Sequence, residues 1–190
     1  MSKLVKLLFH PIALLILFCF FLYWELFLLG RIPLPADALV GTNFPWLDYK
    51  WGFPAGVPVR NPGISDTFSQ IYLWKHLAVE MLSQAIFPLW NKYSLSGSPL
   101  LANYQSAVIF PANLILLLSK QFGWGLYVFG STLTAAFAFY FFIRRHVISP
   151  WSRLIGSVIF ATAGLMTTWV EFGTGVWAAA FFPILLFCFD

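Results

Sequence analysis

The chain has 190 residues, of which 60% are apolar, 20% aromatic and only 9% charged, and its formal net charge is +4. An ordinary soluble domain carries about 25% charged residues, so a soluble fold of this composition could not cover its own surface. Disorder is also excluded, because disordered chains have low hydrophobicity. The composition therefore predicts a polytopic membrane protein. Cationic residues flank its apolar segments, a pattern that sets membrane orientation, and no nucleic-acid partner is expected.

The first predicted element is a membrane-spanning helix over residues 7–29, an apolar run with few polar interruptions. This run exceeds the roughly 20 residues that cross a bilayer, and it lacks the short core and small-residue cleavage site of a secretory signal. Lys3 and Lys6 precede it, and cationic flanks stay on the cytoplasmic side. We therefore expect an uncleaved first span with the N-terminus in the cytoplasm.

Residues 31–105 form a long loop, which this orientation places outside the cytoplasm. Six prolines in its first half make long regular elements unexpected there. Its second half has the pattern of an amphipathic helix over about 66–85, with Asp66 and Gln70 on the polar side and Lys75 alone among apolar residues. We expect this helix to lie along the membrane surface with its lysine reaching back to water.

One short apolar segment follows the loop, and three longer apolar segments come after it. Residues 107–118 are too few to cross a bilayer and predict an interfacial or re-entrant helix. Residues 123–143 and 154–170 predict the second and third spans, separated by a cationic cluster that belongs inside. Residues 176–190 resemble the start of a fourth span, so the chain is expected to be the first part of a larger protein.

Two aspartates of the loop are candidates for chemistry. Asp66 stands where a helix is expected to begin, and aspartate is a preferred N-cap residue, so the residues alone favour a capping role. The alternative is a general base at the membrane surface that takes a proton from an acceptor hydroxyl. For Asp37, a turn carboxylate and a functional carboxylate are equally good interpretations.

The loop also carries cations that could meet a phosphate group. Arg60 is the first choice because arginine binds phosphate in a bidentate manner, although contact with lipid headgroups is the favoured explanation. The other candidate cations of the loop are Lys75, His76 and Lys92. The tryptophans of the loop are interpreted as membrane-interface anchors, with sugar stacking on one of them as the secondary alternative. They are Trp46, Trp51, Trp74 and Trp90. The two cysteines and three histidines show no metal-binding spacing, so no metal site is predicted.

Several short stretches occur in the order found in YfhO-like bacterial membrane proteins. Residues 64–74 (ISDTFSQIYLW) resemble the aspartate-to-glutamine segment of that family. Residues 88–91 (PLWN) and 96–106 (SGSPLLANYQS) are similar to the stretch that follows, and residues 110–114 (FPANL) to the next one. The resemblance covers about residues 31–118, and it is carried by the joint order of motifs that are each short.

This resemblance implies an all-α GT-C glycosyltransferase fold: many transmembrane helices in a bacterial inner membrane and a long first outer loop. Such enzymes move a sugar from a polyprenyl-phosphate donor to an acceptor outside the cytoplasm, here a surface or cell-wall glycopolymer or a glycolipid. It implies that Asp66 is the catalytic base and Asp37 a second acidic candidate. The candidate substrate-binding residues are Gln70, Arg60, His76, Asn103 and Gln105. No cofactor is implied beyond the lipid-linked donor, and a divalent metal is left open.

Other function classes compete with this one. A non-catalytic polytopic protein that binds glycolipids or assists envelope assembly would use the same outer groove. A transporter is disfavoured because the apolar runs hold almost no charge in mid-span. The family resemblance also implies several hundred residues, so these 190 residues are expected to be inactive alone, since later helices would complete the donor pocket.

Overall fold

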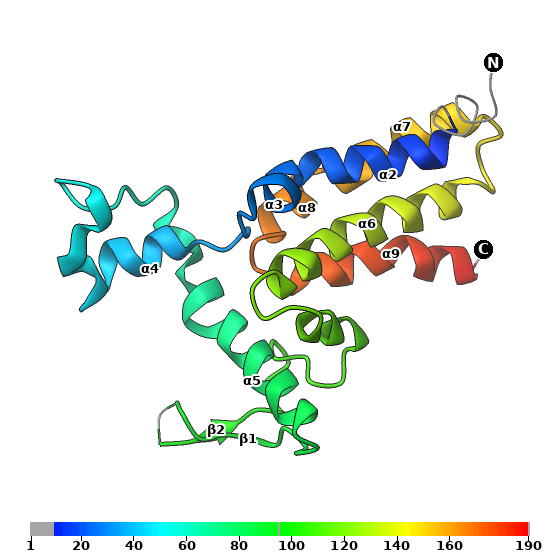
Figure 1. The fold of residues 1–190 in the computed structure, drawn as a ribbon. Helices are drawn as coiled ribbons and strands as arrows, with labels where there is room; N and C mark the ends of the chain where they lie inside the picture. Colours follow the sequence, from blue (N-terminus) through cyan, green and yellow to red (C-terminus); the bar gives the residue numbers. More distant parts are fainter. Residues whose placement is uncertain (1–9, 95, 190) are drawn as a thin grey trace. The chain divides into compact units, whose positions relative to one another are not determined.

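The computed structural model describes residues 10–94 and 96–189 and is mostly helical (Figure 1). It divides into two compact units. One, the helical unit, combines the chain up to Ile32 with the chain from Val128 onward. The other, the loop unit, is Pro33–Tyr127. Each unit is described by itself.

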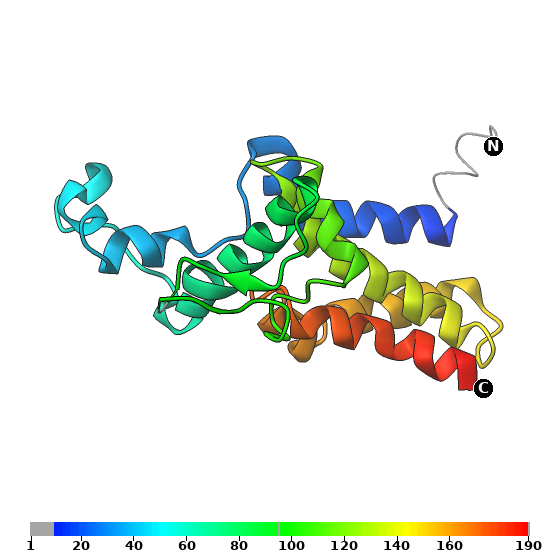
Figure 2. The ribbon, with the colours of Figure 1, turned by 90° about the horizontal axis from the view of Figure 1, so that it is seen from below.

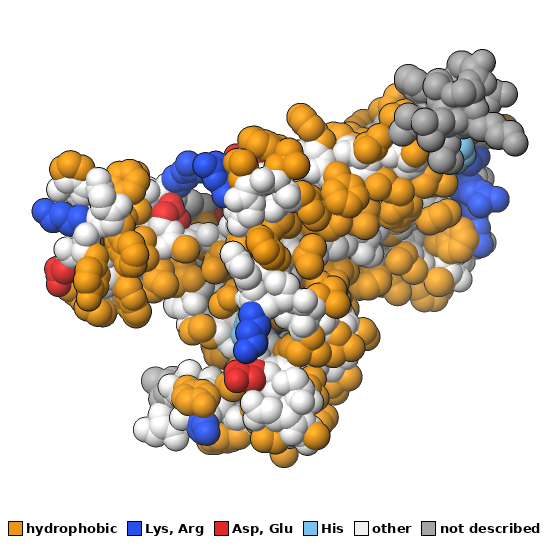
Figure 3. Space-filling view, viewed as in Figure 1, with side chains coloured by type: hydrophobic (Ala, Val, Ile, Leu, Met, Phe, Trp, Pro, Cys, Tyr) orange, Lys and Arg blue, Asp and Glu red, His pale blue; other side chains and the backbone are white. Residues whose placement is uncertain are grey.

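The helical unit consists of apolar helices. They are α2 (Pro11–Leu22), α3 (Trp24–Leu29), the greater part of α6 (Gly123–Ile143), α7 (Pro150–Ala161), α8 (Gly164–Trp169) and α9 (Gly175–Phe189). Helix α2 packs against α7, and α8 contacts both α7 and α9 (Figures 1 and 2). Over these helices the space-filling view is mostly hydrophobic, with charged side chains confined to small areas (Figure 3).

Helix α6 has the bounds that the sequence predicts for the second span, 123–143. It is the one helix in the described part of the chain that is long and apolar enough to cross a membrane. The expected first span is found as two helices, α2 and α3, which are joined at Tyr23. Helix α2 begins at Pro11, after the N-cap residue His10, and the expected residues 7–9 lie outside the described residues.

The third predicted span, 154–170, is not continuous. Helix α7 begins at Pro150, where proline suits the first helical position, and Ser149 Oγ accepts a hydrogen bond from the Ser152 backbone N–H at 3.4 Å. The chain leaves the helical conformation at Ala163, and α8 then starts as a separate short helix. The last helix, α9, agrees with the expected start at 176 to within one residue.

The loop unit consists of short elements. They are α4 (Ala36–Thr42), the 3₁₀ helices η1 (Trp46–Gly52) and η2 (Pro62–Ile64), the π-helical turn η3 (Thr67–Ile71), α5 (Tyr72–Ser83), the antiparallel pair β1 (Trp90–Asn91) and β2 (Ser98–Pro99), and the 3₁₀ helix η4 (Pro111–Leu117). The proline-rich first half contains no element longer than seven residues, as predicted. The expected helix at 107–118 is the shorter η4.

The apolar face of α5 is covered by protein. Its residue Ala78 forms a buried cluster with Leu100 and Val108 from the following segment, and η4 packs against the same helix. The expectation that this face of the helix lies on lipid is therefore wrong.

At the end of η4 the chain passes so close to Gly123 that a Cβ there would lie 2.8 Å from the Leu116 carbonyl oxygen.

Candidate functional site

The segment around Asp66 begins earlier than the sequence suggests. Asn61 caps η2 by accepting a hydrogen bond from the Gly63 backbone N–H at 3.1 Å, and the chain is helical from there onward. Asp66 is therefore within the helix, and its side chain makes no capping hydrogen bond. Its exposed carboxylate instead accepts a hydrogen bond through Oδ1 from Gln70 Nε2 at 3.2 Å. The capping interpretation of Asp66 is wrong, because the helix starts several residues upstream.

A π-helical turn directly follows Asp66. The backbone N–H of Tyr72 donates to the Thr67 carbonyl, five residues earlier. Such turns are rare and are frequent at functional sites. The hydroxyl of Thr67 is fully buried and has no hydrogen-bond partner among the described residues. The turn also breaks the uniform 100° spacing, so the polar faces before and after it do not follow one helical register.

Asp37 and Arg60 lie together although 23 residues separate them. Asp37 Oδ2 accepts a hydrogen bond from the backbone N–H of Arg60 at 2.9 Å. The same stretch approaches α4 so closely that a Cβ on Gly41 would lie 3.0 Å from the Val57 carbonyl oxygen. This contact gives Asp37 a structural task, the attachment of residues 57–60 to α4. Helix α4 in turn contacts η3, so the elements that carry the two aspartates are neighbours.

His76 is held in one orientation on α5. Its ring lies against the Tyr72 ring with centroids 4.0 Å apart, and its Nδ1 is 3.0 Å from the Tyr72 carbonyl oxygen. A carbonyl can only accept, so Nδ1 carries the proton and Nε2 is left as an acceptor. Burial lowers the pKa of His76, against the opposing effects of that carbonyl and of Glu80. Burial therefore favours the neutral form of the imidazole.

Lys75 is buried, with 1% of its surface exposed, rather than extended toward water. Its Nζ donates a hydrogen bond to Asn113 Oδ1 at 3.2 Å and lies 5.2 Å from the centroid of the Tyr127 ring. Burial lowers the pKa of Lys75 to about 8. The expectation that this lysine reaches back to the surface is wrong, because its neighbours on α5 pack inside the loop unit.

The amide of Asn113 connects Lys75 to the turn that holds two of the candidate binding residues. Its Nδ2 donates to the carbonyls of Ser106 at 3.0 Å and Ala107 at 2.7 Å. In that turn Asn103 Oδ1 accepts from the Gln105 backbone N–H at 3.0 Å, a side-chain turn typical of asparagine. These contacts give Asn103 a role in shaping the chain.

The structure thus brings the candidate residues together in separate pairs. Asp66 contacts Gln70, Asp37 contacts Arg60, and Asn103 contacts Gln105. Within residues 10–94 and 96–189 no group of three or more histidine, cysteine, aspartate or glutamate side chains could hold a metal ion.

A pocket at the C-terminal end of α5 combines Trp90, already singled out from the sequence, with Glu80 and Gln84, which the sequence analysis did not select as site residues. Its volume is about 300 Å³. It is lined by Leu77, Glu80, Met81, Gln84, Ile86, Trp90, Lys92 and Tyr93. The signal in the sequence is the pair Glu80, on α5, and Gln84, the C-cap residue of that helix, which lie four positions apart and precede the aromatic residues Trp90 and Tyr93.

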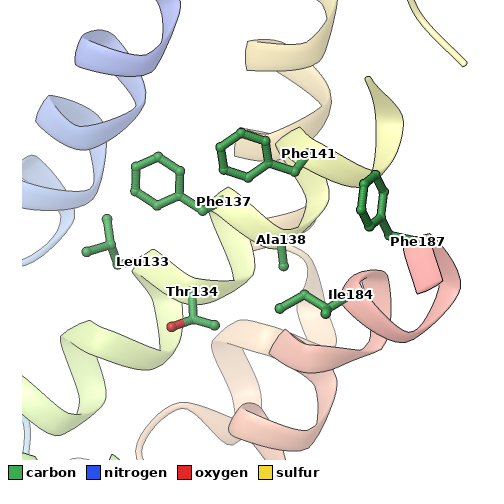
Figure 4. Close-up of a pocket in the computed structure, with 7 residues that line it drawn as sticks. All are labelled: Leu133, Thr134, Phe137, Ala138, Phe141, Ile184 and Phe187. Atoms are coloured by element: carbon green, nitrogen blue, oxygen red, sulfur yellow. The ribbon is translucent and has the colours of Figure 1, made fainter. Parts of the chain in front are cut away.

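The helical unit has a groove of a different character between α6 and α9 (Figure 4). Its volume is about 290 Å³. It is lined by Leu133, Thr134, Phe137, Ala138, Phe141, Ile184 and Phe187. The guanidinium of Arg145 lies 3.9 Å from the Phe187 ring centroid and donates to the Phe187 carbonyl at 2.9 Å. The lining offers hydrocarbon with a single hydroxyl, a surface suited to an apolar chain.

Comparison with protein-family models, with curated protein sequences and with solved structures gives no match. The functional interpretation therefore rests on the geometry of the residues and on the motif order.

Proposed function

We propose that the chain belongs to a membrane glycosyltransferase of the GT-C type, which moves a sugar from a polyprenyl-phosphate donor to a hydroxyl of an extracytoplasmic glycan or glycolipid. Asp66 is the general base of this proposal. The observation that supports it is the exposed Asp66 carboxylate, which caps no helix and uses Oδ1 to accept from Gln70. Its second oxygen, Oδ2, has no hydrogen bond among the described residues.

The proposed step needs one proton acceptor from this region. The acceptor hydroxyl transfers its proton to Asp66 Oδ2 as its oxygen forms a bond to the anomeric carbon of the donor sugar. The bond between that carbon and the phosphate oxygen breaks, and polyprenyl phosphate leaves with the electron pair. Gln70 holds the carboxylate through its 3.2 Å hydrogen bond, so that the free oxygen keeps one orientation.

The membrane setting is part of the proposal. Helix α6 is long and apolar enough to span a bilayer. Helices α2 and α3 together run from Pro11 to Leu29, and a straight helix of that length would cover roughly 28 Å at about 1.5 Å per residue, which is an upper bound for the kinked pair. This length is close to the hydrocarbon thickness of about 30 Å. We propose a multi-pass protein of a bacterial inner membrane, in which kinked helix pairs act as spans.

Asp66→Asn tests the catalytic role. Asparagine keeps the size of the side chain and an oxygen that can accept from Gln70, but it cannot take a proton at neutral pH. General-base catalysis contributes about 10²- to 10⁴-fold, so we expect at least a hundredfold loss of sugar transfer. The measurement is transfer from a radiolabelled polyprenyl-phosphate hexose in membranes that contain the full-length protein.

The matched control is Asp48→Asn, which changes an exposed carboxylate in η1. Both variants must insert and keep the wild-type circular dichroism spectrum. Sugar transfer at the wild-type rate in the Asp66→Asn variant would show that Asp66 is a surface carboxylate with no catalytic role.

Glycolipid binding without catalysis is the second candidate function. The pocket at the end of α5 favours it, because a ligand could bind there without any proton transfer. Surface glycans that stay unchanged on deletion of the protein, together with loss of a partner from the membrane, would support this second function over the first.

A further inference from the structure

The pocket at the C-terminal end of α5 is separate from the Asp66 carboxylate. Its residue Glu80 follows Asp66 by 14 positions of helical chain, and a helix rises about 1.5 Å per residue, so the two carboxylates are roughly 20 Å apart along the helix. The two groups cannot act on the same atom. The pocket therefore needs an explanation of its own.

Hydrogen bonds hold the described residues beside the aromatic side chains. Asn91 is buried, and its Oδ1 accepts from the Tyr93 backbone N–H at 2.9 Å while its Nδ2 donates to Ser94 Oγ at 3.1 Å. The indole of Trp90 packs on Gly97 so closely that a Cβ on that glycine would lie 2.9 Å from Trp90 Cε2. The ring is nevertheless 52% exposed. One aromatic face is thus fixed in place before any ligand arrives.

The polar groups of the pocket can hydrogen-bond to a ligand. No ion pair joins Glu80 to Lys92 among the described residues, although both line the same pocket. The Lys92 Nζ instead lies over the Tyr93 ring, 5.2 Å from its centroid. The Glu80 carboxylate can accept hydrogen bonds, the Lys92 ammonium can donate them, and the Gln84 amide can do both. The pocket therefore offers donors and acceptors beside the exposed rings of Trp90 and Tyr93.

We propose that this pocket binds one saccharide ring. A pyranose has C–H groups on its faces and hydroxyls around its rim, which matches aromatic surfaces bordered by a carboxylate, an amide and an ammonium. Trp90 and Tyr93 pack against the faces of the ring, and Glu80, Gln84 and Lys92 bond to its hydroxyls. A lipid tail would leave these polar groups without partners. Only the identification of this ring as a distant unit of the glycan acceptor rests on the proposed function.

The test is a binding measurement that requires no transfer. The full-length protein in lipid nanodiscs is titrated with methyl glycosides of glucose, galactose, mannose, N-acetylglucosamine and glucuronic acid, and saturation-transfer NMR reports the contact. Sorbitol, which has hydroxyls but no ring, is the control ligand. We expect at least one pyranoside to bind, and Trp90→Ala and Glu80→Gln each to weaken this binding about tenfold or more.

Matched variants keep the test independent of folding. Trp46→Ala and Asp48→Asn change exposed residues of η1 and should leave binding unchanged. If Trp90→Ala does not fold, Trp90→Phe and Glu80→Gln carry the test. Binding of no pyranoside, equal binding of sorbitol, or binding that all the pocket variants retain would overturn the proposal.

A further variant separates this inference from the proposed function. Asp66→Asn should bind the pyranoside as the wild type does, since it lies at the other end of the helix. Loss of transfer with retained binding supports both proposals, retained transfer with retained binding removes only the catalytic role of Asp66, and lost binding overturns the separate pocket.

Discussion

The helical unit and the loop unit solve the same problem, the pairing of backbone polar groups, in opposite ways. In the helical unit most N–H and C=O groups pair within helices, and large apolar side chains such as Phe21 and Ile155 stay exposed at 71% and 60%. This is the arrangement that lipid demands. In the loop unit, asparagine side chains bond directly to backbone groups of short elements. They are Asn43, Asn61, Asn91, Asn103 and Asn113.

This difference predicts where single substitutions do harm. Helical backbone pairing is repeated at every residue, so the loss of one side-chain contact removes a small part of the total. The loop unit depends on a few amides, of which most shape a turn within two to five residues and one, Asn113, also joins segments 38 residues apart. Asn113 alone connects α5 to two consecutive carbonyls. Substitutions that break such an amide should therefore exceed any polar substitution in the helical unit.

The largest effect is expected for Asn113→Ala. The substitution leaves the Lys75 ammonium and the buried Ser106 carbonyl without a hydrogen-bond partner, whereas the partly buried Ala107 carbonyl still accepts from the Phe110 backbone N–H at 2.8 Å. Leaving a buried polar group unsatisfied costs about 1–3 kcal/mol, and more for a charged group, so for these two groups we expect a loss of about 4 kcal/mol in the free energy of unfolding. Urea unfolding of the protein in detergent, followed by circular dichroism, measures it.

The control for this prediction is Asn43→Ala. Asn43 also bonds to backbone carbonyls but is exposed, so water replaces the lost contacts and the cost should stay near 1 kcal/mol. Equal losses for the two variants would show that burial of the Asn113 contacts contributes nothing.

The second effect concerns pH and Lys75. Burial lowers its pKa in the folded protein to about 8, below the ordinary value of 10.5. Between these two pH values the unfolded chain holds a proton that the folded protein does not, so stability rises as pH increases through this window. The rise is at most about 3 kcal/mol, since one pKa unit corresponds to 1.36 kcal/mol.

Lys75→Met should remove this contribution. The slope of unfolding free energy against pH should fall between pH 8 and 10.5 in this variant relative to the wild type, and the comparison cancels groups common to both. Lys120→Met, at an exposed position, is the control. Wild-type and Lys75→Met curves that run parallel across the window would show that the lysine is solvated in the folded protein.

The smallest effect is expected in the helical unit, for Tyr23→Phe. The Tyr23 hydroxyl and Thr132 Oγ1 are 2.7 Å apart and join the α2–α3 junction to α6. Hydrogen bonds between helices in membranes contribute about 0.6 kcal/mol on average. A double-mutant cycle with Thr132→Val measures the coupling. A coupling energy above about 2 kcal/mol between Tyr23 and Thr132 would contradict the expected difference between the two units.

Helix bounds in the helical unit were predictable because the length of an apolar run is a local property of the chain. The bounds of α6 and the start of α9 follow from such runs. The breaks at Tyr23 and Ala163 were not predictable, since both positions lie within continuous apolar stretches. Hydropathy counts residues and carries no information on where a helix changes direction.

The candidate site was predictable only where its partners are close in sequence. The Asp66–Gln70 contact follows from a spacing of four residues on a helix. The contact of Asp37 with the Arg60 backbone joins residues 23 apart, and that of Lys75 with Asn113 joins residues 38 apart. No periodic pattern encodes such separations, because they depend on how the loop closes.

By itself, the sequence determined the apolar character of this protein, the bounds of its apolar helix α6 and the position of a polar helix that carries Asp66 and Gln70. These are properties of neighbouring residues. Only the tertiary structure decided that Lys75 is buried, that Asp66 is free of a capping role, and that Glu80 and Trp90 share one pocket. The physical reason is that a side chain is buried only where a second surface packs on it. The sequence of α5 defines its apolar face, and the tertiary fold determines which segment covers that face.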